Sequence, residues 1–94
     1  MNANSKQNIQ IAAEICFKWS WDARKYKKVF EKLVAILNKK YKVKSEVNSS
    51  QSNFDIFLIN NNKKVKLYSL ELEDKLLDEA GIDNIVKLID SSFA

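Results

Sequence analysis

Three segments of the chain alternate apolar and polar residues, the pattern of a strand with one buried face, and a fourth is a short, mostly apolar run. Residues 9–15 place isoleucine and alanine at every second position, and residues 41–47 and 63–70 alternate apolar with charged side chains. Residues 54–59 are rich in aromatic and β-branched side chains, which favour extended structure. We therefore predict four β-strands.

A helical period replaces the alternation between residues 21 and 40. Apolar side chains recur there every three or four residues, and lysines occupy the other faces. Ser20 is a suitable N-cap for this helix, while Lys39 and Lys40 suit the negative end of its dipole. The apolar stripe consists of Ala23, Tyr26, Phe30, Leu33, Val34 and Leu37.

The C-terminal part of the chain contains a second helical pattern. Residues 82–93 carry apolar side chains at helical spacing, and Asp83 is placed near the expected N-terminus of that helix. Residues 71–81 are acidic and lack a clear period, so we expect a loop with one helical turn. The asparagines at 60–62 favour a tight hairpin turn between the third and fourth strands, because asparagine tolerates positive φ angles.

The order of these elements is strand, helix, strand, strand, strand, helix. The first three form a parallel β-α-β crossover and the next two a hairpin. This order predicts an α/β (α+β) domain of the thioredoxin-like kind, with a four-stranded mixed sheet covered by two helices. An α/β plait of the ferredoxin type would need its second helix between the third and fourth strands, where 60–62 leave no room for one.

Length and composition favour one small domain. The chain has 94 residues, so we assign 9–94 to a single domain and 1–8 to a polar, disordered leader. One cysteine and no histidine exclude an internal disulfide and the usual zinc ligand sets, and no metal site is expected. A lone thiol is typical of a reducing compartment, and no targeting or membrane-spanning segment is visible. We expect an intracellular, cytoplasmic protein without a membrane partner.

The stretch "CFKWSWDAR" (16–24) lies between the first strand and the first helix. It resembles the C-x-x-C-x-W-x-x-R motif of the selenoprotein W (Rdx) family, small thioredoxin-fold proteins with a redox motif at this place. Cys16, Trp21 and Arg24 match in register. Trp19 stands where the family has its second cysteine or selenocysteine.

Two further places agree with the family. "NFDIFLINNNKKVKLYS" (53–69) is similar to its F-E-V strand, Asn-Gly-type turn and return strand. Gly81 falls where the family has a glycine ahead of the last helix. The resemblance, over residues 9–92, implies a redox function, and the loss of the second thiol leaves only a monothiol cycle through Cys16. No resident cofactor is implied, and glutathione would be the external resolving thiol.

The position of Cys16 favours this chemistry on physical grounds. A cysteine just after a strand and just before a helix meets free N–H groups and the positive end of the helix dipole, which favour thiolate over thiol. Lys18 and Arg24 add positive charge nearby. The opposing interpretation, a buried and inert cysteine, stays open.

A binding function is the alternative to redox chemistry. Trp19 is a candidate contact residue, because tryptophan is enriched at binding hot spots, and Lys18 adjoins it. Lys25, Lys28 and Lys32 on the exposed side of the first helix would contact a protein partner, a larger assembly or, with less support, RNA or another polyanion. Residues 18–66 carry thirteen Lys/Arg against four Asp/Glu. A solvated helix face explains these lysines equally, and the acidic segment 71–79 is interpreted as solvated surface.

Overall fold

A computed structural model describes residues 7–18 and 20–93 of the protein. Its elements, in chain order, are β1 (Gln7–Ile15), α1 (Ser20–Leu37), β2 (Tyr41–Ser49), β3 (Phe54–Asn60), β4 (Lys63–Ser69), α2 (Leu70–Glu73) and α3 (Glu79–Ser92).

The four strands form one mixed sheet in the order β2-β1-β3-β4. β1 runs parallel to β2, as predicted for a crossover through α1, and β3 runs antiparallel to both β1 and β4. The predicted α+β architecture with a four-stranded mixed sheet is therefore confirmed. The chain adds one short helix, α2, that the predicted order did not contain as an element of its own.

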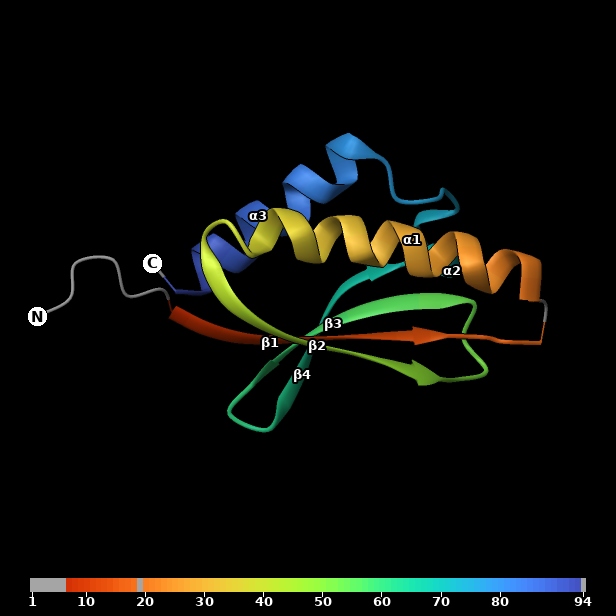
Figure 1. The fold of residues 1–94 in the computed structure, drawn as a ribbon, viewed down its shortest axis with the longest axis horizontal. Helices are drawn as coiled ribbons and strands as arrows, with labels where there is room; N and C mark the ends of the chain where they lie inside the picture. Colours follow the sequence, from red (N-terminus) through yellow and green to blue (C-terminus); the bar gives the residue numbers. More distant parts are fainter. Residues whose placement is uncertain (1–6, 19, 94) are drawn as a thin grey trace, which may run out of the picture.

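The two long helices lie over the same face of the sheet (Figure 1). α1 packs on β1 and β2, and α3 contacts β4. The alternating residues of β1 point to the helices, and all of them are buried. Most apolar stripe positions of the two helices are buried as well, and Tyr26, Val34 and Val86 are partly buried against the core. The buried strand and helix positions include Ile9, Ile11, Ala13, Ile15, Phe30, Leu33, Leu37, Ile82, Ile85 and Ile89. The hydrophobic effect thus fixes which side of each element faces inward.

The hairpin turn follows the predicted chemistry. Asn61 and Asn62 have φ angles of 51° and 67°, and these two residues connect β3 with β4. Two successive positive φ angles are the geometry of a type I′ turn, which matches the twist of the flanking strands. The asparagines therefore set the register of the hairpin.

Element boundaries differ from the prediction at the N-terminal half. β1 begins at Gln7, two residues earlier than the predicted strand. Gln7 and Asn8 therefore belong to the sheet and not to the leader predicted over 1–8. Residues 1–6 lie outside the described part. α1 ends at Leu37, and Lys39 and Lys40 lie in the turn that follows it. Ser20 is the first residue of α1, not the residue that precedes it.

The start of α3 was predicted wrongly. The helix begins at Glu79, and its N-cap is Asp78, whose carboxylate accepts a hydrogen bond of 2.9 Å from the N–H of Gly81. Asp83 consequently lies inside the helix. The apolar period begins only at Ile82, so the first turn of α3 carries no periodic signal and its start is marked by the capping aspartate alone.

Candidate functional site

Cys16 directly follows the inner strand β1, and its side chain is partly buried. Its backbone N–H donates to the carbonyl of Asn53 at 3.2 Å, and the N–H of Ser50 donates to the carbonyl of Ile15 at 3.0 Å. The loop between β2 and β3 thereby closes against the end of β1. The N–H of Cys16 itself is occupied by this contact, and the expectation that N–H groups at the start of α1 stabilise a thiolate stays a prediction.

The positive end of α1 lies four residues beyond Cys16 in the chain. Phe17 and Lys18 form a turn, both side chains are exposed, and α1 begins at Ser20. Asp22 lies in the first turn of the helix. Its carboxylate interacts favourably with the helix dipole and offsets part of the positive potential there.

The cationic residues predicted to assist the thiol are on the surface. Arg24 is exposed on α1, and no hydrogen bond or ion pair joins it or Lys18 to Cys16 within residues 7–18 and 20–93. The assignment of Arg24 as a thiolate stabiliser therefore stays a prediction. Trp19, the predicted contact residue, lies outside the described residues.

The basic side of α1 is exposed, as predicted for either a binding surface or a solvated face. Lys25 and Lys28 are exposed. Lys32 pairs with Glu79 of α3 at 3.4 Å, and both side chains are largely exposed. Exposed pairs of this kind contribute between 0 and about 1 kcal/mol, so the pair does not prevent Lys32 from meeting a partner.

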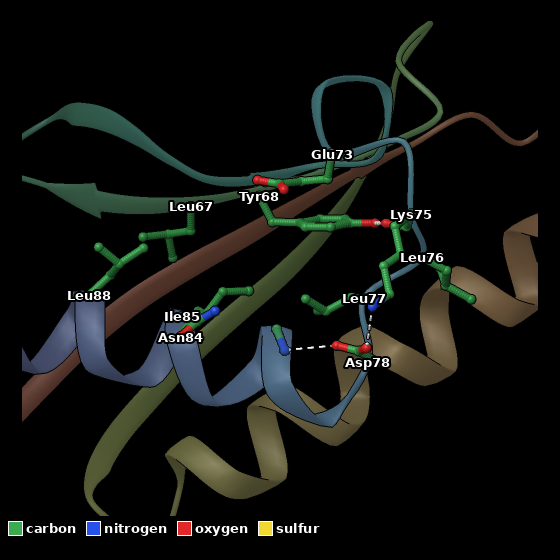
Figure 2. Close-up of a pocket in the computed structure, with 11 residues that line it drawn as sticks. Leu67, Tyr68, Glu73, Lys75, Leu76, Leu77, Asp78, Asn84, Ile85 and Leu88 are labelled. Atoms are coloured by element: carbon green, nitrogen blue, oxygen red, sulfur yellow. Dashed lines mark hydrogen bonds and ion pairs between the residues drawn. The ribbon is translucent and has the colours of Figure 1, made fainter.

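Sequence reasoning missed a cavity of about 330 Å³ between β4, α3 and the segment that joins α2 to α3. Leu67 and Tyr68 line it from β4, and Ile85 and Leu88 line it from α3 (Figure 2). Leu77, which also lines it, is buried, although residues 71–79 were interpreted as solvated surface. The pair of leucines at 76–77 inside the acidic segment was the available signal.

Tyr68 is a buried residue of the cavity wall. Its hydroxyl donates to the carbonyl of Lys75 at 2.7 Å, and burial raises the pKa of Tyr68 to about 12 (Figure 2). Lys75 in turn pairs with Asp78 at 2.9 Å. These contacts hold the segment after α2 against β4 and shape the cavity wall.

Within the described part of the chain, no group of three or more His, Cys, Asp or Glu side chains is placed to hold a metal ion. No helix there is long and apolar enough to cross a bilayer. In the comparisons with known proteins, no family model, no curated protein and no solved structure matches the chain.

Proposed function

We propose that the chain is a thioredoxin-like protein of the selenoprotein W type that acts as a monothiol through Cys16. The observation that carries the proposal is the position of Cys16: a partly accessible thiol at the end of the inner strand β1, ahead of the N-terminus of α1. The sheet order β2-β1-β3-β4, with β1 and β2 parallel and a β3–β4 hairpin, supports the thioredoxin-like assignment.

The proposed cycle uses glutathione as the external thiol, because the chain has one cysteine. The Cys16 thiolate attacks the glutathione sulfur of a disulfide between glutathione and a substrate protein, forms a mixed disulfide with that glutathione and releases the substrate's thiolate. Oxidised glutathione is the simplest disulfide that can replace this substrate in a test. A second glutathione thiolate then attacks the glutathione sulfur of the mixed disulfide. This step restores the Cys16 thiolate and returns oxidised glutathione.

Mass spectrometry of the intact chain tests the first half of this cycle. Incubation with oxidised glutathione is expected to add one glutathione to the folded protein, and reduced glutathione is expected to remove it. Cys16→Ser is the control and gains none. A folded chain that stays unmodified under conditions that modify the unfolded chain contradicts the proposal, because the thiol is then inert.

The role of Arg24 can be tested on the same reaction. If the Arg24 guanidinium stabilises the Cys16 thiolate, its loss lowers the fraction of thiolate, so Arg24→Gln is expected to slow adduct formation. Lys28→Gln, an equal loss of charge further along the exposed side of α1, is the matched control and leaves the rate unchanged. Equal rates for both variants remove Arg24 from the site.

A redox-inactive binding module is the second candidate, and the exposed surface around Cys16 favours it. Phe17 is 46% exposed, and Lys18 next to it in the chain is exposed. Lys25 and Lys28 are exposed on α1. An exposed aromatic side chain near several cations suits a protein partner or, with less support, RNA or another polyanion. Retention of the protein on an immobilised polyanion, measured over a salt gradient, tests binding to RNA. Weaker retention of the Lys25→Gln/Lys28→Gln variant supports RNA binding through this surface, and retention equal to that of the parent chain contradicts it.

A further inference from the structure

β4 forms one edge of the sheet, so the outer side of its backbone is not paired with another strand within the described residues. The N–H and C=O groups on that side can pair with an extended segment from another molecule. This edge lies beside the cavity described above, because Leu67 and Tyr68 of β4 belong to its lining.

The groove next to this edge is apolar between Leu67 and Leu88, whereas Glu73, Lys75, Asp78 and Asn84 also line the cavity. Val65 pairs with Leu58, which is buried beneath the helices, so Val65 points to the same side and is 47% exposed. Leu88 of α3 is 51% exposed and lines the cavity together with Leu67; Figure 2 shows the two leucines facing each other between β4 and α3. A strand added to β4 would place every second side chain into this groove.

The opposite side of β4 is basic. Lys64 and Lys66 pair in the hairpin with Ile59 and Phe57, so they point to the face without helices, and their ammonium groups lie 5.0 Å and 5.8 Å from the Phe57 ring centroid. Lys64 also pairs with Glu14 at 2.6 Å. β4 contains no acidic residue. The other side chains of an added strand would therefore meet positive charge.

We propose that the β4 edge binds an extended segment of a partner protein by strand addition, and that the segment alternates apolar and acidic residues. The apolar residues enter the groove at Leu67 and Leu88, and the acidic residues pair with Lys64 and Lys66. A second copy of β4 is disfavoured as the occupant, because strand pairing between two copies would bring their lysines together. The inference does not depend on the chemistry of Cys16.

Synthetic peptides test the proposal on the full chain. The probe is the peptide ELEVELE with blocked ends. The controls are KLKVKLK, which reverses its charges, and ELEVELE N-methylated at two adjacent central residues, which removes a backbone donor from each side of the strand. Amide chemical shifts of the labelled protein report where the probe binds. We expect perturbation of residues 63–69 and of α3 around Leu88 by ELEVELE, with weaker binding of both controls.

Matched substitutions on the two edges of the sheet separate strand addition from general charge attraction. Lys64→Gln/Lys66→Gln is expected to weaken ELEVELE binding by about tenfold or more, equivalent to about 1.4 kcal/mol. Lys42→Gln/Lys44→Gln removes the same charge from exposed lysines of β2 and is expected to leave binding unchanged. Leu88→Ser, at an exposed position that leaves the core intact, is expected to weaken binding by a similar factor.

Several results would overturn the proposal. If ELEVELE causes no chemical-shift changes in β4, the lysines of β4 only prevent strand pairing between two copies of the chain, a known use of charge on edge strands. Equal loss of ELEVELE binding for the two lysine double variants, or equal binding of the N-methylated peptide, would exclude strand addition. A dimer in sedimentation experiments whose interface is β4 would identify a second copy as the occupant.

Discussion

The hydroxyl of Tyr41, at the start of β2, donates a hydrogen bond to the carboxylate of Asp90 near the C-terminal end of α3. Lys40 donates to the other oxygen of the same carboxylate at 2.7 Å. Both bonds lower the pKa of Asp90, with the contribution of Lys40 the larger. The Tyr41–Asp90 bond joins the last helix to the strand that begins directly after α1, and so ties the end of the chain to the β-α-β unit.

Loss of this bond should destabilise the fold measurably. Tyr41→Phe is expected to lower the free energy of unfolding by about 1.5 kcal/mol, because the lost hydrogen bond has a charged acceptor and a buried donor residue. Urea denaturation followed by circular dichroism measures the change. Tyr26→Phe is the matched control, since no hydrogen bond of the Tyr26 hydroxyl is found among the described residues. Equal effects of the two variants would show that the Asp90 bond contributes nothing.

The ionisation of the tyrosines predicts a loss of stability at high pH. Burial, followed by the hydrogen bond to Asp90, raises the pKa of Tyr41 from 10.0 to about 12, and burial raises that of Tyr68 from 10.0 to about 12. A pKa that is higher in the folded state means that the stabilisation is complete below pH 10.0 and is lost as the pH rises toward about 12.

Phenolate absorbance measures this effect directly. All three tyrosines of the chain have a raised pKa in the fold, with burial the largest cause for each. We expect the folded protein to reach half ionisation at a higher pH than the same protein in urea. Coincident titration curves would contradict the burial of Tyr41 and Tyr68.

The β3–β4 turn offers a stabilising substitution. Asn62 has a φ angle of 67°, at the second central position of the hairpin turn. Glycine adopts positive φ without steric cost, so Asn62→Gly is expected to keep or raise stability by up to about 1 kcal/mol, whereas Asn62→Ala lowers it. Thermal unfolding of both variants checks the order. A destabilising Asn62→Gly would mean that the turn is not of type I′.

Much of this fold follows from short-range patterns in the sequence. The alternation at Ile9–Ile15 and the helical stripe from Ala23 to Leu37 both indicate burial on one side. Burial of that side determines how each of these two elements packs, so both could be predicted. The start of α3 was not predictable in this way, because Glu79 and its neighbours carry no apolar period. Its capping bond from Gly81 to Asp78 is a single local contact that many acidic residues of this chain could have made.

The two candidate sites also differ in whether short-range sequence patterns predict them. The place of Cys16 could be predicted, because the change from alternation to helical spacing marks the junction of β1 and α1. The groove beside β4 could not, since it depends on the order of strands in the sheet. Alternation shows which side of β4 is buried, and it does not show that β4 lies at an edge with Leu88 next to it.

We propose that the fold makes Cys16 a reactive thiol. The most direct test is the rate at which oxidised glutathione modifies the chain at neutral pH, folded in buffer and unfolded in urea, with each rate normalised to that of a free cysteine peptide in the same solvent. We predict a faster normalised reaction for the folded protein, because a monothiol role requires Cys16 to react more readily than a free thiol. A folded chain that reacts no faster than the unfolded chain would contradict it.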